Sequence, residues 1–333
     1  MQNKLQTRKL DEDEYEEWDK LVAQSTFGTI FHDSEWLNLN SKFFNKKLNF
    51  YGCFENGELI GGCPIFLNNK SNFLKVASST CKLIPYNGVL IKTSDSPKVT
   101  KQERNRAEII NSLINSFDSS NFDHIRIHNS PALDDIRFFS WHGWNSIINY
   151  AYYLDLKNTE DIYLSPDAKR NIKKAENESI ITEKSSDIES FSVLYKDNYK
   201  RQNIKPPGNK HFFKKMFDML VRREMGELWT AKTTSGELAA AEIFIYDKHC
   251  VYRWCAATEY ELRQTGAYVL LLWDVFKDLG SRGFSKINLM AANTPHLANF
   301  IIKFNPRLVP NYGVEKCSIK FDLMKLFKKI FKK

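Results

Sequence analysis

An internal repeat with an offset of 162 residues constrains the fold of this 333-residue chain more than any other feature. A stripe of apolar residues at helical spacing occurs in the first half and returns in the same register in the second half. Its members are Ile109, Ile110, Leu113, Ile114 and Phe117 in the first copy, and Leu271, Leu272, Val275, Phe276 and Leu279 in the second. Each match alone is weak evidence, so the prediction of two copies depends on the elements around the stripe.

These surrounding elements follow the same order in both copies. A hairpin turn centred on Gly57 precedes the first helix, and one centred on Gly236 precedes the second. An apolar strand follows each helix, with the matching residues Ile125 and Ile127, then Ile287 and Leu289. The sequence therefore predicts an α/β (α+β) fold of two tandem domains, each a mixed, mostly antiparallel sheet flanked by helices. The expected domains are residues 1–154 and 155–315, followed by a tail of residues 316–333.

The two copies differ at the entry to the repeated helix. Gly57 and Ile109 are 52 positions apart, whereas Gly236 and Leu271 are 35 apart. The 17 extra positions of the first half are expected to form a long polar loop in place of a tight helix entry. One domain is therefore expected to have kept a site that the other has lost.

Composition narrows the class of protein. The 24 Phe, 14 Tyr and 7 Trp exclude a disordered chain, and no apolar run approaches the ~18 residues of a membrane span. The N-terminus is unlike a secretory signal, and the six cysteines show no CxxC spacing, so reduced thiols in a cytoplasmic protein are expected. GxSxG and HExxH motifs are absent, and the seven histidines show no metal-ligand spacing. No metal is expected.

The net charge of +8 is concentrated in the tail. Residues 316–333 carry seven lysines against the single acid Asp322, which leaves a charge of only +2 on the rest of the chain. Apolar residues recur in the tail at spacings of three and four, at Leu323, Met324, Phe327, Ile330 and Phe331. Two interpretations stay open: an amphipathic helix on an anionic membrane surface, at the inner face of the plasma membrane, or a frayed tail that only aids solubility.

The entry to the second repeated helix has the residues of an anion site. Arg263, Gln264, Thr265, Gly266 and Ala267 follow directly after a strand and open the helix. A helix start presents unpaired N–H groups, and glycine there allows close approach of a pyrophosphate. The first-half entry, residues 101–105, has no glycine. A phosphorylated donor is therefore expected in the second domain only, although a helix start after a turn is more often purely structural.

These residues resemble the acyl-CoA loop of the GNAT acyltransferases. Arg263, Gly266 and Ala267 fit its pattern, whereas Tyr268 stands where the pattern has Gly or Ala. Two tandem GNAT-like domains resemble, more narrowly, the Fem-type transferases. The landmarks of this resemblance are residues 31–37, 165–175, 251–257 and 300–304. The resemblance implies transfer of amino acids from aminoacyl-tRNA to lipid-linked peptidoglycan precursors, or acetyl-CoA-dependent transfer as in relatives of these enzymes.

The candidate catalytic residues are Lys303 and Tyr252. Lys303 lies within an apolar run, where a lysine either extends to solvent or stabilises developing negative charge. The Fem-type pattern places a functional lysine in this Lys-Phe context, and the resemblance therefore favours a catalytic role. Tyr252 needs a partner for its hydroxyl if it is buried, and it lines either an acyl channel or the packed sheet.

The candidate substrate-binding residues are Trp36, Arg170, Lys173 and Trp254. Arg170 and Lys173 share one face of an expected helix and either grip a diphosphate between the domains or form a solvated face. Trp36 has the alternative of a buried core position, and so has Trp254, for which packing is the safer interpretation.

Together these features predict an acyltransferase of cell-envelope precursor synthesis. An acyl-CoA or aminoacyl-tRNA donor would pass its group to an amine acceptor, which the tail suggests is lipid-linked. The first alternative is an acetyl-CoA-dependent N-acetyltransferase acting on an amino sugar or amino acid. The near-neutral body favours this alternative, since a tRNA-binding surface should be basic. The second alternative is a non-enzymatic protein that binds a membrane surface.

Overall fold

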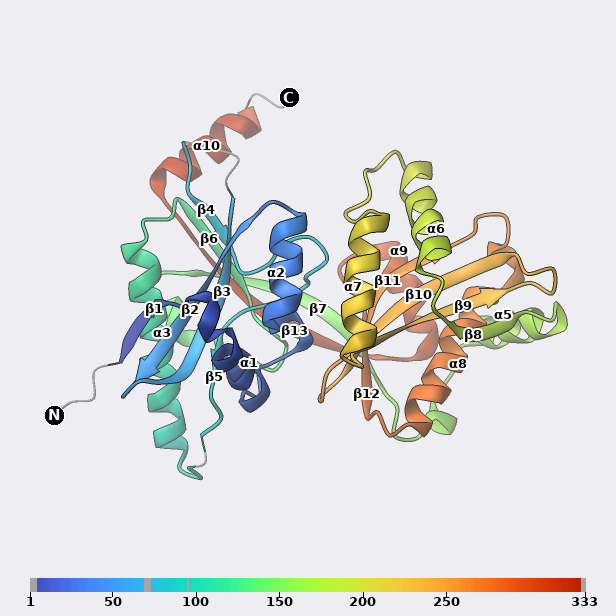
Figure 1. Ribbon diagram of the computed structural model, residues 1–333, viewed down its shortest axis with the longest axis horizontal. Helices are drawn as coiled ribbons and strands as arrows, with labels where there is room; N and C mark the ends of the chain where they lie inside the picture. Colours follow the sequence, from blue (N-terminus) through green and yellow to red (C-terminus); the bar gives the residue numbers. More distant parts are fainter. Residues whose placement is uncertain (1–4, 69–72, 95, 331–333) are drawn as a thin grey trace. The chain divides into compact units, whose positions relative to one another are not determined.

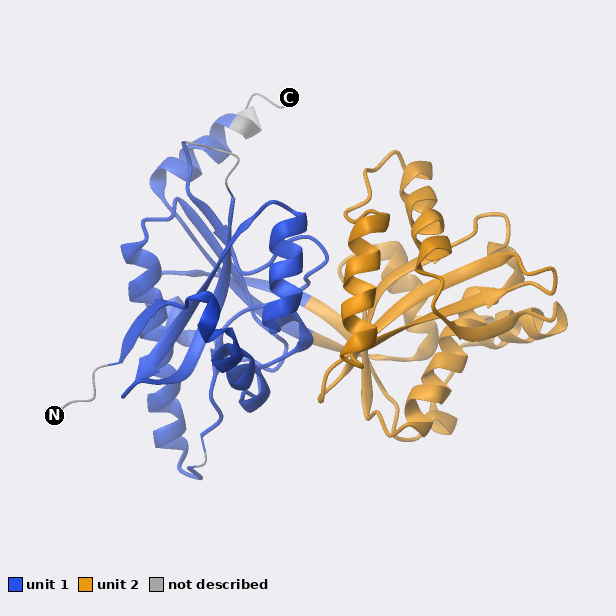
Figure 2. Ribbon diagram, viewed as in Figure 1, with its two compact units in different colours: residues 1–149, 310–333 blue, residues 150–309 orange. Residues whose placement is uncertain are grey.

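The chain divides into two compact units. The computed structural model describes residues 5–68, 73–94 and 96–330, without the side chains of 328–330. The first unit contains residues 1–149 and 310–333, and the second contains residues 150–309 (Figure 2). No helix in the described part of the chain is long and apolar enough to cross a membrane.

The first unit is a mixed sheet with helices on both faces (Figure 1). Its strands lie in the order β1-β2-β3-β4-β6-β13, and β5 pairs with β3. The elements are β1 (Gln6–Lys9), α1 (Tyr15–Gln24), α2 (Ser34–Phe43), β2 (Lys47–Glu55), β3 (Glu58–Asn68), β4 (Val76–Ser78), β5 (Leu90–Ile91), α3 (Val99–Ser119), β6 (His124–His128), α4 (Arg137–Trp141) and, from the end of the chain, β13 (Arg307–Cys317) and α10 (Ile319–Ile330). Most pairings are antiparallel, but β4 and β6 are parallel.

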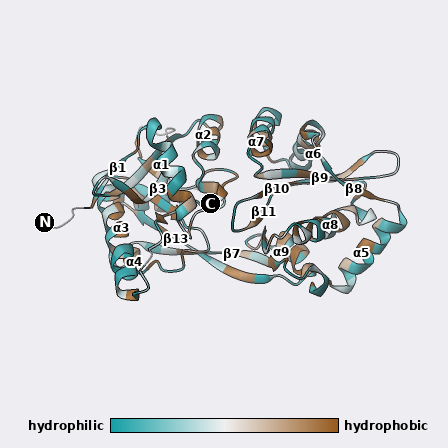
Figure 3. Ribbon diagram, turned by 60° about the horizontal axis from the view of Figure 1, so that its bottom comes forward, coloured by the Kyte–Doolittle hydropathy of each residue, from teal (hydrophilic) through white to brown (hydrophobic). Residues whose placement is uncertain are grey.

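The second unit repeats this plan, with strands in the order β7-β12-β11-β10-β9-β8. Helices α6 and α7 cover one face of the sheet, and α5 and α8 cover the other (Figure 3). The elements are β7 (Asn145–Asp155), α5 (Pro166–Asn177), β8 (Ile181–Ser185), α6 (Ile188–Arg201), α7 (Lys210–Arg222), β9 (Gly226–Lys232), β10 (Leu238–Tyr246), β11 (Val251–Thr258), the short 3-10 turn η4 (Arg263–Thr265), α8 (Ala267–Ser281), β12 (Lys286–Met290), α9 (Pro295–Ile301) and the 3-10 turn η5 (Ile302–Phe304). The predicted fold class is therefore confirmed.

The offset of 162 residues between the two copies also separates the boundaries of equivalent strands. β6 and β12 are displaced by 162 residues at both ends, and so are β7 and β13. The register repeats as well: Arg126 pairs with Glu315 in the first unit, and Asn288 pairs with Tyr153 at the equivalent positions of the second. The repeated helical stripe is buried in α3 and in α8.

The division between the units differs from the expected domains 1–154 and 155–315. The second unit begins within β7, at Tyr150, and residues 310–315 belong to the first unit. The reason is strand pairing: the end of β7 pairs with β12, whereas the end of β13 pairs with β6. Each sheet is thus completed by a strand that follows the other copy in the sequence, and local periodicity contains no information about such a long-range partner.

A close approach of α8 to the sheet forms the core of the second unit. Ala239 and Ala240 of β10 are buried and belong to the same core cluster as the apolar face of α8. Small side chains on the strand allow the larger side chains of the helix, such as Leu272 and Phe276, to approach the sheet closely. This packing fixes the N-terminus of α8 relative to the strands.

The core of the first unit contains a fully buried histidine, His32. Its Nδ1 lies 2.9 Å from Thr29 Oγ1, and its carbonyl accepts a hydrogen bond of 2.7 Å from Trp18 Nε1. Burial lowers the pKa of His32 to about 3. The imidazole is therefore neutral in the folded protein, whereas in the unfolded chain it binds a proton near pH 6.5.

We expect this histidine to make the protein less stable in mild acid. Below about pH 6.5 only the unfolded chain takes up the proton, so the free energy of unfolding should fall by about 1.4 kcal/mol per pH unit from this group. Urea unfolding between pH 5.5 and 4.5 measures this slope. The slope should be smaller by that amount in His32→Gln and unchanged in His296→Gln, which alters an exposed histidine. Equal slopes in the wild type and His32→Gln would contradict the assignment.

Candidate active site

The candidate site lies where the pairing between strands β11 and β12 ends. These strands are parallel, and their registered pairs are Val251 with Ile287 and Tyr252 with Asn288. Within the described chain the ladder stops there, although β11 continues to Thr258. The pairing of β11 with β10 also shifts at this point, from Cys255 to Arg253, so that Trp254 is the extra residue of a β-bulge. The two strands therefore diverge beside a bulge.

Gly266 connects η4 to the first turn of α8. Its φ of 80° lies in the left-handed region that favours glycine. A Cβ at this position would lie 2.2 Å from the backbone oxygen of Asn171 on α5. Gly266 therefore has a structural reason for its identity, and it holds the start of α8 against α5.

The other residues of the predicted donor segment surround this glycine. Thr265 Oγ1 donates to the carbonyl of Leu262 at 2.7 Å and accepts from Ala267 N at 3.2 Å. Arg263 and Gln264 are exposed, and the Arg263 guanidinium lies over the ring of Tyr260 and donates to Thr258 Oγ1. The segment is thus a helix start with two exposed polar side chains, a geometry suited to an anion.

Tyr268 joins a buried ion pair. The Glu242 carboxylate is 1% exposed and accepts from Arg253 Nε at 2.8 Å and from the Tyr268 hydroxyl at 2.9 Å. Arg253 also donates to the Tyr268 hydroxyl. Burial raises the pKa of Tyr268, so its phenol stays protonated and available as a donor. Burial likewise raises the pKa of Glu242, and the charge of Arg253 opposes this shift.

A second ion-pair group contains Lys303. Its Nζ lies 2.5 Å from Asp167 Oδ2, and Asp167 also pairs with Arg170, so the structure brings these two predicted residues together through one carboxylate. The hydrogen bond from Lys303 holds the pKa of Asp167 below its usual range. Asp167 stands in the first turn of α5, where Ser165 caps the helix and Pro166 occupies the first position.

Phe300 links the two ion-pair groups. Its ring stacks on Tyr268, with centroids 5.4 Å apart and planes 9° apart. The Lys303 ammonium lies 5.5 Å from the centre of the same ring. Lys303 is therefore separated by a single aromatic ring from the second residue of α8, next to the predicted donor segment.

The remaining predicted residues have other surroundings. Tyr252 is buried and donates from its hydroxyl to Asp247 Oδ2 at 2.9 Å. Trp254 packs against Phe212 and Phe213, with ring centroids about 6 Å apart. Lys173 is exposed on α5.

Trp36 is fully buried in the first unit, where it forms an edge contact with Phe31 at 5.7 Å. Its backbone N–H donates to Asp33 Oδ1 at 2.9 Å, which caps α2. These contacts are those of a core residue that positions the start of the helix.

The first unit fills the equivalent place beside β6 with its own backbone. Asn87 N donates to the carbonyl of His128 at 2.8 Å, and Val89 N donates to Asn129 Oδ1 at 3.1 Å. A Cβ on Gly88 would lie 2.2 Å from Asn129 Oδ1. The expectation of a long polar loop here is wrong, because much of this segment is buried and contains β5.

One further cavity of the second unit, of about 770 Å³, lies between β8, α6, α7 and β9. Its lining contains the acids Glu189, Asp218 and Glu227 beside lysines. Lys184 of this lining pairs with Glu227 at 3.5 Å, so its charge is already balanced. The mixed charge makes the cavity a poorer place for an anionic donor than the start of α8.

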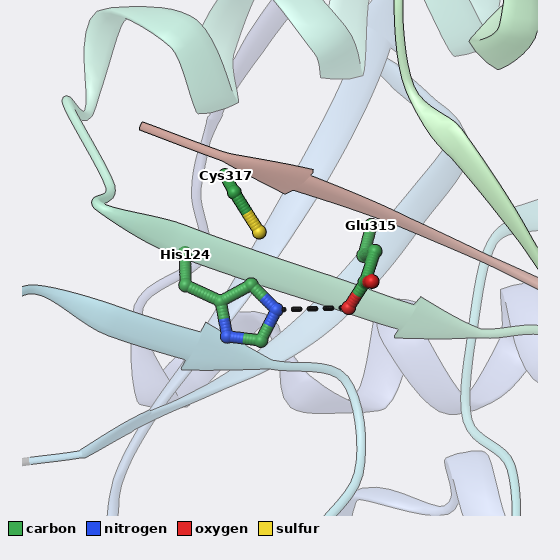
Figure 4. A group of neighbouring side chains, drawn as sticks. All are labelled: His124, Glu315 and Cys317. Carbon is green, nitrogen blue, oxygen red and sulfur yellow. Dashed lines mark hydrogen bonds and ion pairs between the residues drawn. The ribbon is translucent and has the colours of Figure 1, made fainter. Parts of the chain in front are cut away.

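In the first unit His124, Glu315 and Cys317 point toward one another (Figure 4). Their potential ligand atoms all lie within 4.8 Å of one another, and such a set suits Zn²⁺. However, Glu315 accepts from Arg126 at 2.7 Å, and Lys325 donates to Cys317 Sγ at 3.4 Å. These cations engage the lone pairs that a metal would need, so we assign the cluster a structural role under α10.

Comparison with known proteins places the fold of the second unit in the GNAT class. Residues 166–296 match the acetyltransferase (GNAT) domain family. The crystal structure of FemX is similar with a TM-score of 0.67 at 11% identity, over 96% of this chain and 99% of that chain. Comparison with curated proteins gives no match.

Two more solved structures share the fold. The C-terminal domain of a putative lysylphosphatidylglycerol synthetase from Agrobacterium fabrum aligns with a TM-score of 0.58 at 11% identity, over 96% of each chain. A tandem GNAT protein from the clavulanic acid biosynthesis pathway aligns with a TM-score of 0.53 at 12% identity, over 94% of this chain and 98% of that chain. The predicted resemblance to Fem-type transferases of the GNAT superfamily is thus confirmed at the level of the fold.

Sequence reasoning missed Glu242, Asp167 and the linking role of Phe300. One signal was available for Glu242, an acid within the apolar run of residues 239–245. A buried acid in a strand requires a buried cation or donor, and Arg253 on the next strand was the available partner. Asp167 gave no comparable signal, because Lys303 is far from it in sequence.

We expect Gly266→Ala to destabilise the protein more than Gly236→Ala. Both glycines have positive φ, which costs an alanine about 1 kcal/mol, but nothing lies within 4 Å of a Cβ on Gly236. Overlap with Asn171 should add about 1–3 kcal/mol at Gly266. Urea unfolding of both variants measures the difference, and equal losses would show that α5 adapts freely.

Breaking the buried ion pair should cost more than removing the phenol that bonds to it. Glu242→Gln leaves Arg253 with its charge unpaired and should lower the free energy of unfolding by about 3–5 kcal/mol. Tyr268→Phe removes hydrogen bonds to these two charged groups and should cost about 1.5–3 kcal/mol. Denaturant unfolding compares the two variants, and a larger loss in Tyr268→Phe would refute this order.

Proposed function

We propose that this protein is an N-acyltransferase of cell-envelope precursor synthesis. It would move an acyl or aminoacyl group from an activated donor, acyl-CoA or aminoacyl-tRNA, to an amine acceptor, which we propose to be lipid-linked. FemX and the lysylphosphatidylglycerol synthetase domain share the fold, and this likeness supports a role at the envelope. The GNAT domain match supports acyl transfer in general.

One observation carries the proposal: a left-handed Gly266 opens α8 at the end of the bulged strand β11. The helix start supplies N–H groups and the positive end of the helix dipole for a pyrophosphate or a phosphodiester. Arg263, Gln264, Thr265 and Ala267 are the proposed donor-binding neighbours. In the first unit the backbone of residues 87–89 fills the equivalent place, which supports donor binding in the second unit.

The chemistry requires positioning more than covalent catalysis. The acceptor amine attacks the donor carbonyl and a C–N bond forms. The bond from the carbonyl carbon to the leaving sulfur or oxygen breaks, and the proton lost from the nitrogen goes to that leaving atom. Negative charge develops on the carbonyl oxygen during the attack. Lys303, held by Asp167 and by the ring of Phe300, is the proposed cation for this charge.

The other predicted residues have two kinds of proposed role, phosphate binding and packing. Arg170 and Lys173 remain the proposed contacts for a phosphate of the acceptor, since both are exposed on α5. For Tyr252 and Trp254 the observed contacts support a packing role, so we propose that they shape the site without touching the reacting atoms. The contacts of Trp36 support a packing role in the core of the first unit.

A second candidate is an acetyl-CoA-dependent N-acetyltransferase acting on an amino sugar or amino acid. The observation that favours it is charge: outside residues 316–333 the chain carries only +2, which is little for a tRNA-binding surface. The donor experiment below separates the two candidates.

We expect calorimetry to detect donor binding that depends on the second unit. Acetyl-CoA and an aminoacyl-tRNA are each titrated into the protein, and one of them should bind with micromolar affinity. Gln264→Glu places a negative charge at the exposed helix start and should weaken the binding of this donor about tenfold.

The control is Gln102→Glu, which makes the same change at the equivalent position of the first unit. It should leave donor affinity unchanged. Binding of acetyl-CoA alone favours the second candidate, and binding of aminoacyl-tRNA alone favours transfer to an envelope precursor. If neither donor binds, or if both variants behave alike, the proposed donor site is wrong.

Once a donor is known, Lys303→Gln should lower kcat roughly 100-fold while leaving donor affinity unchanged. Lys277→Gln breaks a similar lysine–aspartate pair, with Asp274 at 2.7 Å, and should leave kcat unchanged. Turnover with a precursor peptide bearing a free amine measures kcat, and thermal unfolding checks the fold. A loss of activity that follows a loss of stability would make Lys303 structural.

A further inference from the structure

Helix α10 is fixed to the first unit by one of its faces. Ser318 N donates to the carbonyl of Asp123 at 2.8 Å, immediately before the helix begins. The ring of Phe321 stacks on His124, with centroids 4.4 Å apart and planes 21° apart. Lys325 reaches Cys317 of β13 from the same helix. The helix is therefore a docked element with a defined orientation.

The opposite face of α10 carries exposed apolar side chains. Ile319 is 81% exposed, and Leu323, Leu326 and Phe327 are each between 51% and 58% exposed. These residues are spaced by three and four, so they share one side of the helix. Phe321, the docked residue, is about 200° around the helix from Ile319. The apolar side therefore points away from the sheet to which the helix is docked.

Phe73 extends this apolar surface beyond the helix. Lys320 of α10 donates to the backbone carbonyl of Phe73, which places the end of the β3–β4 connection beside the helix. The side chain of Phe73 is 83% exposed. We call Ile319, Leu323, Leu326, Phe327 and Phe73 the apolar face.

Positive charge accompanies the apolar face. Residues 316–333 carry seven lysines and one acid, whereas the rest of the chain is nearly neutral. Lys320 of α10 is exposed, and Lys325 is exposed on the docked side of the helix. A narrow apolar strip with lysines around it matches a surface that is anionic outside and apolar beneath.

We propose that the apolar face binds the surface of an anionic lipid bilayer. Phe73 and the apolar side chains of α10 would enter the headgroup boundary, and the lysines would contact lipid phosphates. The argument depends on exposure, helix orientation and charge, and it is independent of the proposed acyl transfer. A solubility tail would not need an ordered helix whose apolar side faces outward.

Vesicle flotation with the full-length protein tests this proposal. Phosphatidylcholine vesicles with and without phosphatidylglycerol are compared, at low salt and at about 0.5 M ionic strength. The protein should float with the anionic vesicles, remain unbound with the neutral ones, and be largely released by salt. Equal binding to both vesicle types, or to neither, would overturn the proposal.

Leu323→Glu with Phe327→Glu places two charges on the apolar face and should reduce the bound fraction at least tenfold. The matched control is Val193→Glu with Ile204→Glu, two exposed apolar residues of the second unit, and it should bind like the wild type. Thermal unfolding confirms that both double variants fold. Unchanged binding of Leu323→Glu with Phe327→Glu would refute the assignment of the face.

Lys328→Gln with Lys329→Gln provides a test that leaves the apolar face intact. This variant should weaken binding to anionic vesicles about threefold or more, because it removes two of the seven positive charges of residues 316–333. Sedimentation in the absence of lipid checks for another occupant. If the wild type is a dimer that Leu323→Glu with Phe327→Glu separates, the face joins two copies of this chain and the lipid proposal falls.

Discussion

The buried ion pair between Glu242 and Arg253 is the interaction on which the candidate site depends. The two residues belong to the neighbouring strands β10 and β11, beside the bulge of β11. Both side chains are buried, so an unpaired charge there would be costly. Tyr268 closes the pair from the first turn of α8 and carries Phe300 on its ring. Lys303 lies over the ring of Phe300, so its position depends, through Phe300 and Tyr268, on the buried Glu242–Arg253 pair.

This dependence explains the departure of Tyr268 from the GNAT loop pattern. A glycine or alanine at this position would leave the carboxylate of Glu242 without one donor and Phe300 without its stacking partner. The equivalent residue of the first unit is Arg106, which faces Asp135 at 3.6 Å. The two units thus start the repeated helix with different polar partners, and in the second unit this residue is linked to a lysine through an aromatic ring.

Local periodicity determined how much of the fold could be predicted. The register of α3 and α8 was predictable because burial of one helix face imposes a pattern on neighbouring residues. The pairing of β13 with β6 was not, because a strand encodes which face is buried and not which distant strand it joins. The candidate site divides in the same way: residues 263–267 lie in one segment and were predicted together, whereas the Asp167 partner of Lys303 comes from a separate helix.

The strand pairs β7–β12 and β13–β6 are equivalent in the two units, but they carry different side chains. In the second unit Asn288 donates to the Tyr153 hydroxyl at 3.0 Å and accepts from Met290 N at 2.8 Å, so this strand pair is neutral. In the first unit the same register holds Arg126 and Glu315, and the charged pair recruits His124. Hydrogen bonds from Arg126 and His124 hold the pKa of Glu315 below its usual range against the effect of burial. The ring of His124 also stacks on Phe321. The Arg126–Glu315 ion pair, through His124, therefore helps to hold the helix that carries the apolar face.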